Sequence, residues 1–137
     1  MERWVAVAGA VLGGLGVVAG TFAAHGLDQM LSAELLEVFE VGVRYHLFHA
    51  LAMIIAALVA ERGGRLFAVV AGGLFGLGIL LFSGALYVRA IADVRAWGML
   101  APFGGMCLIM GWMSLVVATW QWGRGPGEAR PGRSSHD

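Results

Sequence analysis

The stretch 34–60, ELLEVFEVGVRYHLFHALAMIIAALVA, decides the fold. It begins as an acidic amphipathic helix and ends as a continuous apolar run of the kind that crosses a membrane. Three polar side chains, Arg44, His46 and His49, lie where the amphipathic part becomes apolar. The other long apolar segments carry no charge, so we expect the polar chemistry of the chain to gather here and in the preceding loop.

The composition predicts an integral membrane protein of one domain. Hydrophobic residues make up 59% of the 137 residues and charged residues 13%, whereas soluble domains carry about 25% charged residues. The formal net charge is zero, so no basic surface predicts nucleic-acid binding. One cysteine, Cys107, allows no disulfide within the chain.

Four apolar segments predict an all-α bundle of four antiparallel transmembrane helices. We expect spans at 4–24, 41–60, 66–88 and 102–122, an interfacial helix at 33–44 and a disordered cytoplasmic tail at 123–137. A signal peptide is the alternative for the first segment, because small residues precede a cleavage point near Ala24. Its apolar run exceeds the usual length of about 7–15 residues and Glu2 interrupts the basic start, so we favour a retained span.

Small residues follow one face of the first span and part of the third at steps of three and four. Such faces let helix backbones approach closely, and this packing drives helix association in lipid. The expected packing positions are Gly9, Gly13, Gly16, Gly20, Gly72 and Gly76. The pattern leaves open whether the partner is another helix of this chain or a second copy.

The arginines predict the orientation in the membrane. If the N-terminus is cytoplasmic, the outer loops contain only Arg89 and Arg95, with Arg44 near the outer boundary. The cytoplasmic segments then contain Arg3, Arg62, Arg65, Arg124, Arg130 and Arg133. The positive-inside rule therefore favours two cytoplasmic termini.

The polar residues around the second helix predict one cluster toward the outer leaflet, with a structural or lipid-binding role. Its expected members are His25, Glu40, Arg44, Tyr45, His46 and His49. Glu40 and Arg44 have the i,i+4 order that favours an ion pair on a helix. Alternatively, Arg44 extends to the membrane surface or binds a lipid headgroup.

His46 and His49 lie three residues apart on one helix face, a spacing also found in metal sites. A third ligand such as His25 would lie about 10–15 Å away along the bundle axis, at about 1.5 Å per residue. We therefore favour hydrogen-bonded histidines over a metal or haem site, and we predict no cofactor.

A series of motifs resembles the YgdD-like family, small four-span membrane proteins grouped as a domain of unknown function. The motifs are GTFAAHGL at 20–27, RYHLFHAL at 44–51, LFSGALY at 81–87, PFGG at 102–105 and GW at 111–112. The chain departs from the family pattern at Ala23, where glycine is usual, and at His46, where glutamine is common. The resemblance implies a multi-pass protein of the bacterial inner membrane and brings no established reaction or ligand.

Two function classes follow from these features. The first is a non-enzymatic accessory, assembly or lipid-interacting protein that acts through helix association, with membrane lipids and either a second copy or a larger complex as partners. The second is a small transporter or channel, although the first, third and fourth spans lack the carboxylate that proton-coupled exchange needs. An enzyme is not predicted, because Ser83, Ser114 and Cys107 have no base nearby in the sequence.

Overall fold

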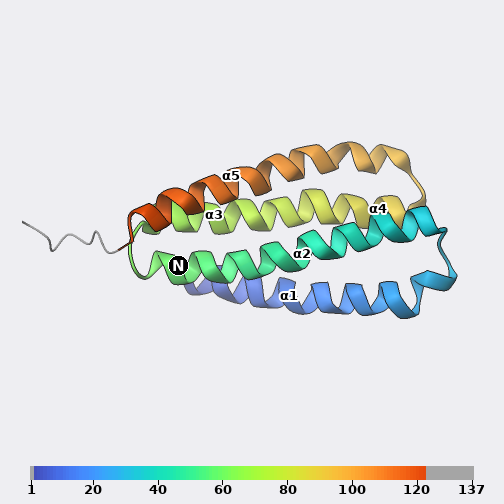
Figure 1. Cartoon of the computed structure of the whole chain (residues 1–137), viewed down its shortest axis with the longest axis horizontal. Coiled ribbons are helices and arrows are strands. Elements are labelled where there is room, and N and C mark those ends of the chain that lie inside the picture. Colours follow the sequence, from blue (N-terminus) through green and yellow to red (C-terminus); the bar gives the residue numbers. More distant parts are fainter. Residues whose placement is uncertain (1, 123–137) are drawn as a thin grey trace, which may run out of the picture.

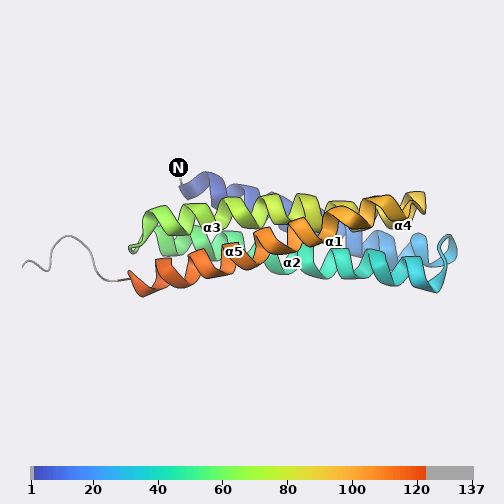
Figure 2. The same cartoon turned by 90° about the horizontal axis from the view of Figure 1, so that it is seen from above.

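The computed structural model describes residues 2–122, which form four antiparallel helical segments (Figures 1 and 2). The elements are α1 (Glu2–His25), η1 (Leu27–Gln29), α2 (Ala33–Ala60), α3 (Arg65–Gly78), the π-helix η2 (Ile79–Ser83), α4 (Gly84–Ala92), η3 (Arg95–Leu100) and α5 (Ala101–Trp120). Each segment is long and apolar enough to cross a membrane. The predicted all-α, four-span membrane fold is thereby confirmed, while the predicted tail at 123–137 lies outside the described residues.

α2 is one continuous helix of 28 residues, which contains both the interfacial start expected at 33–44 and the span expected at 41–60. Ser32 caps its start: the Ser32 hydroxyl accepts a hydrogen bond from the Leu35 N–H at 3.3 Å. At about 1.5 Å per residue, α2 is about 42 Å long, which exceeds the hydrocarbon thickness by about 12 Å. The acidic first turns therefore extend beyond the apolar part of the bilayer.

The turn between α2 and α3 depends on two glycines. Gly63 and Gly64 have φ values of +140° and +60°, which residues with a Cβ rarely adopt. Gly64 also packs against the backbone of Ala118 near the end of α5, where a Cβ would have no room. This turn therefore ends α2 and brings the start of α3 against α5.

The glycine face of α1 lies against α2. A Cβ on Gly9 would come within 2.8 Å of the Ala50 carbonyl oxygen, and one on Gly16 within 2.7 Å of the Leu47 side chain. Gly13 has more room, because its nearest neighbour would be 3.9 Å away. The predicted positions that face α2 are Gly9, Gly13, Gly16 and Gly20. The partner of this face is therefore a helix of the same chain.

The two predicted packing positions on α3 face different helices. Gly72 is buried against the side chain of Val5 on α1. Gly76 faces Met53 on α2, whose methyl carbon would lie 3.5 Å from an added Cβ. α3 thus contacts both α1 and α2 through glycines spaced by four.

The third segment is not the plain span predicted at 66–88: it runs over Arg65–Ala92 and contains the π-helix η2 in its middle. α5 crosses this π-helix at Gly104, where a Cβ would lie 2.7 Å from the carbonyl carbon of Leu81. The buried residues of α5 follow one face, and they are Ala101, Gly104, Leu108, Gly111, Leu115 and Ala118. This face was not identified in the sequence, although its steps of three and four match those in α1.

α2 is the central helix and α1 lies at the edge of the bundle. In the apolar window of each span, 56% of α2 is buried inside the protein but only 11% of the α1 segment. α1 and α5 lie at opposite edges in Figure 1, with α2 and α3 between them. The bundle is therefore open on the side of α1, where most of the helix faces its surroundings.

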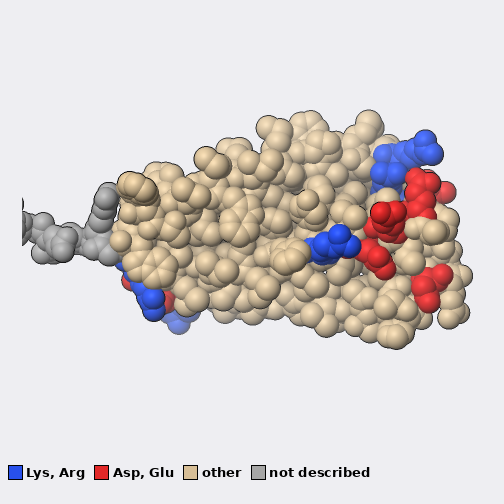
Figure 3. All heavy atoms as spheres, in the orientation of Figure 1, with Lys and Arg blue, Asp and Glu red and all other residues tan. Residues whose placement is uncertain are grey.

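Charged side chains gather at the two ends and leave a broad uncharged belt between them (Figure 3). The end at which α1 starts carries Arg3, Glu61, Arg62 and Arg65. The opposite end carries Asp28, Glu34, Glu37, Glu40, Arg89, Asp93 and Arg95, and Arg44 lies further inward along α2. This distribution is the one that a protein needs when its middle lies in hydrocarbon.

Candidate functional site: a buried histidine pair

His46 is buried on α2 and connects this helix with α4. Its Nδ1 atom lies 3.1 Å from the hydroxyl of Tyr87, within hydrogen-bond distance. Its Cδ2 atom would lie 3.5 Å from a Cβ on Gly16 of α1, so the ring occupies space that this glycine leaves free. His46 therefore contacts one neighbouring helix through a hydrogen bond and another through close packing.

His49 is also buried and connects α2 with α5. Its Nδ1 atom lies 2.7 Å from the Tyr45 carbonyl oxygen, and a carbonyl can only accept, so Nδ1 carries the proton. Its Nε2 atom accepts a hydrogen bond from the indole N–H of Trp112 at 3.1 Å. Both ring nitrogens are thus occupied in the neutral form with the proton on Nδ1. A metal at Nε2 would first have to displace Trp112.

Aromatic rings surround both histidines and complete a cluster that joins α2, α3, α4 and α5. We name it the histidine–aromatic cluster, and its members are Phe39, Tyr45, His46, His49, Phe75, Phe82, Tyr87 and Trp112. The rings of His49 and Phe75 are 5.6 Å apart, and those of Phe75 and Trp112 are 5.3 Å apart and nearly perpendicular. Such edge-to-face pairs stabilise a core beyond simple burial.

Ser83 Oγ, a buried polar atom near this cluster, lacks a hydrogen-bond partner among the described residues. His46 Nε2 makes no hydrogen bond of standard geometry there, although the His46 ring interacts with the Leu12 backbone. Ser83 is completely buried and is the last residue of the π-helix η2. It lies one helical turn before Tyr87, the residue that contacts His46. An unpaired polar group inside a membrane is costly, on the order of several kcal/mol, so these atoms mark the most polar part of the core.

The structure divides the predicted polar cluster into separate parts. Arg44 and His46 are two residues apart, or about 200° around a helix, so they face nearly opposite sides of α2. Glu40 and Arg44 are exposed, and no ion pair joins them within residues 2–122. The hydrogen bonds of the cluster instead involve His46, His49 and the Tyr45 carbonyl.

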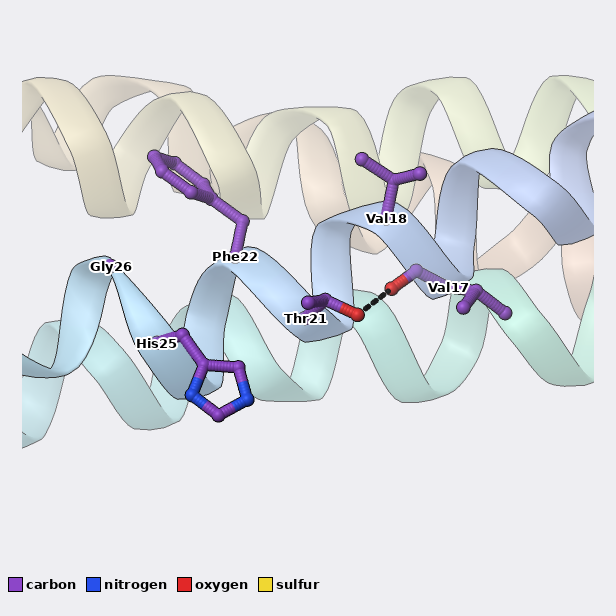
Figure 4. Close-up of a pocket in the computed structure, with 6 residues that line it drawn as sticks. All are labelled: Val17, Val18, Thr21, Phe22, His25 and Gly26. Carbon is purple, nitrogen blue, oxygen red and sulfur yellow. Dashed lines mark hydrogen bonds between the residues drawn. The ribbon is translucent and has the colours of Figure 1, made fainter.

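His25 lies apart from the other histidines, exposed at the end of α1. It lines a shallow surface hollow of about 420 Å³ together with Val17, Val18, Thr21, Phe22 and Gly26. In Figure 4, Phe22 and His25 point to different sides of α1, and the Thr21 hydroxyl donates a hydrogen bond to the Val17 carbonyl. The structure therefore places His25 on the free face of α1 and not in the bundle core.

An ion pair that the sequence did not predict lies at the same end of the bundle. Arg89 near the end of α4 approaches Glu34 at the start of α2, with 3.8 Å between Nη2 and Oε1. These two positions meet because the segments are antiparallel and similar in length. The pair is partly exposed, so its contribution to stability is small.

No group of three His, Cys, Asp or Glu side chains within residues 2–122 lies close enough to hold a metal ion. The functional residues that the sequence did not identify are Ser83, Tyr87 and Trp112. Only their presence in the LFSGALY and GW motifs pointed to these residues in the sequence. Their contact with the histidines depends on the packing of helices, which the spacing within one helix does not determine.

Replacing Trp112 with Phe should lower the free energy of unfolding by about 0.6 to 1.5 kcal/mol, because His49 Nε2 loses its donor while a smaller aromatic ring remains in place. Unfolding by dodecyl sulfate, followed by circular dichroism, measures this change. Trp97→Phe is the matched control, because the Trp97 side chain lies in η3 away from the cluster. Equal losses in the two variants would contradict the role of the His49–Trp112 hydrogen bond.

Comparison with known proteins shows what the chain is similar to. The family model described as "Protein of unknown function (DUF423)" matches residues 19–105. The UPF0382 membrane protein YwdK of Bacillus subtilis (strain 168) is 37% identical over 113 residues, which cover 82% of this chain and 92% of that protein. A UPF0382 membrane protein of Haemophilus influenzae is 38% identical over 77% of this chain and 84% of its own length.

The UPF0382 inner membrane protein YgdD of Escherichia coli (strain K12) is 30% identical over 116 residues, which cover 85% of this chain and 88% of that protein. No solved structure matches the chain significantly. The three relatives cover 77–85% of this chain. The family-model match at residues 19–105 includes every residue of the histidine–aromatic cluster except Trp112.

Proposed function

The chain belongs to the DUF423 family of membrane proteins, as its motifs indicated, and we propose that it acts without catalysing a reaction, by packing against a helix of another membrane protein. The docking surface in this proposal is the free face of α1. The histidine–aromatic cluster has a structural role, because it fixes the remaining helices relative to one another and so gives α1 a rigid support.

The observation that supports this proposal is the unfilled surface of α1. The hollow at Val17, Val18, Thr21 and Phe22 lies on the face that points away from α2 (Figure 4). About one turn before it, Gly14 has no atom within 4 Å of the position where a Cβ would be. Small residues on an outward face of a membrane helix allow a second helix to approach closely.

The orientation in the membrane is part of the same proposal. The α1 start, the α2–α3 turn and the α5 end lie at one end of the bundle, with arginines at positions 3, 62 and 65. The positive-inside rule then favours cytoplasmic termini in a bacterial inner membrane. A reporter fused after Trp122 tests this orientation, since it should be active only on the cytoplasmic side.

The buried polar groups give less support to a transporter. The polar side chains of α2 end at His49, and residues 50–60 are all apolar. A path for ions or protons across the bundle would have to continue past this stretch, where polar groups are needed to replace the water of hydration. We therefore keep association as the proposed function.

A photo-crosslinking amino acid at Val18 should yield a discrete protein adduct in native membranes, whereas the same amino acid at Ile109 on α5 should not. The two side chains are matched, because each is 65% exposed on the surface of the bundle. The mass of the adduct distinguishes a second copy of this chain from a different protein. If neither position, or both equally, yields protein adducts, α1 has no docking role and the proposal is wrong.

A further inference from the structure

A second surface feature lies at the end of the bundle where α1 starts. An apolar surface groove of about 430 Å³ runs along the junction of α3 and α5. Its walls are Leu66, Val70 and Leu74 on α3, and Met110, Met113 and Val117 on α5. The hydroxyl of Ser114, which also lines the groove, donates a hydrogen bond to the Phe67 carbonyl at 2.8 Å, so its polar group is already paired.

The groove runs from the charged end of the bundle toward the membrane interior. Leu66 directly follows Arg65, and Leu74 lies eight residues further along α3. At about 1.5 Å per residue, this part of the groove extends about 12 Å into the apolar belt. Its walls are aliphatic side chains and flexible methionines, which suit a hydrocarbon chain better than a rigid ligand.

Basic residues lie at the end of this groove. Arg62 and Arg65 are exposed in the turn before α3 and at its first residue. The guanidinium of Arg62 lies over the Trp122 ring, 5.2 Å from its centre, which places a positive charge beside the end of α5.

We propose that the α3–α5 groove and the arginines at its end bind one anionic phospholipid. An acyl chain lies along the groove, and the phosphate lies at Arg62 and Arg65. Two features support this proposal. The apolar groove runs from the membrane surface toward the membrane interior, as an acyl chain does, and the positive charges of Arg62 and Arg65 lie at the membrane surface, where an anionic headgroup lies. The proposal does not depend on the proposed docking role of α1, which involves a different face of the bundle.

The test compares phosphatidylglycerol with phosphatidylcholine of identical acyl chains, added to the full chain in a neutral detergent. Native mass spectrometry measures the bound fraction of each lipid. We expect preferential retention of phosphatidylglycerol, reduced about fivefold by Arg62→Gln or Arg65→Gln, as expected for about one charge interaction at the surface. Arg95→Gln, at the opposite end of the bundle, is the control and should leave the preference unchanged.

Filling the groove tests the acyl half of the site separately. Val70→Trp should lower the retention of both lipids, because the larger ring occupies the space of the chain. If this variant does not fold, Val117→Phe serves the same purpose from α5, since both side chains face outward. Equal retention of the two lipids by the unmodified protein would overturn the proposal. So would an unchanged lipid retention in the groove-filled variant, or an effect of Arg95→Gln as large as that of Arg65→Gln.

Discussion

Replacing Gly9 with Leu is expected to detach α1 from α2, whereas Gly14→Leu should leave the bundle intact. A Cβ on Gly9 would lie 2.8 Å from the Ala50 carbonyl oxygen and 3.0 Å from the Met53 Cβ. These atoms belong to the α2 backbone or are bonded to it, so they cannot move away by a change of side-chain rotamer. The larger residue therefore has to separate the helices, at a cost of about 3 kcal/mol or more.

The matched control is strong because Gly14 is in the same helix and has no neighbour within 4 Å of its Cβ position. Both variants add the same apolar side chain, so differences in helix propensity and membrane insertion cancel. The measurement is the free energy of unfolding in a dodecyl sulfate titration at constant lipid content. If both leucine variants lose the same stability, the packing of α1 through its glycine face is not correct.

Much of the fold follows from local features of the sequence. The Ser32 cap fixes the start of α2, and the Gly63–Gly64 pair fixes the turn into α3, because each depends on residues close together in the chain. The α1 glycine face was identified for the same reason, since steps of three and four place residues on one side of a helix. Which helix it contacts required the structure.

The histidine–aromatic cluster was predicted only in part. The spacing of His46 and His49 correctly places both rings on one side of α2, but their partners Tyr87 and Trp112 are 41 and 63 residues away in the chain. The structure places Arg44 away from these histidines, because positions 44 and 46 face nearly opposite sides of α2. The Glu34–Arg89 contact depends on the relative length of two segments, which could not be derived from local spacing.

The π-helix was not predicted, because the segment 66–88 reads as an unbroken apolar run without proline or charge. It coincides with a tertiary contact: α5 approaches the backbone at Leu81 and Phe82 through Gly104, which has no side chain. A π-helix widens the helix by one residue per turn and often occurs at a functional site. Here it places the fully buried Ser83 in the core, next to the turn that carries Tyr87.

Gly104→Ala tests this packing with the smallest change that the chain allows. The added Cβ would lie 2.7 Å from the carbonyl carbon of Leu81 and 2.8 Å from the Cα atom of Phe82. Neither atom can move without disturbing the hydrogen bonds of η2. We therefore expect Gly104→Ala to lower the free energy of unfolding by an amount in the upper part of the range of about 1–3 kcal/mol found for overpacked cores. The loss should appear although alanine has the higher helix propensity, which alone would stabilise α5 by about 1 kcal/mol.

Gly105→Ala is the matched control, because it makes the same substitution one residue later in α5. Its Cβ would be 3.9 Å from the nearest atom, in the Phe82 ring, which is an ordinary contact. We therefore expect Gly105→Ala to be neutral or stabilising and Gly104→Ala to be strongly destabilising in the same dodecyl sulfate titration. Because only the position differs, a reversed order would show that α5 does not cross the third segment at Gly104. The tryptophan fluorescence of the Gly104 variant should also change, because Trp112 lies two turns further along α5 and depends on the same packing to reach His49.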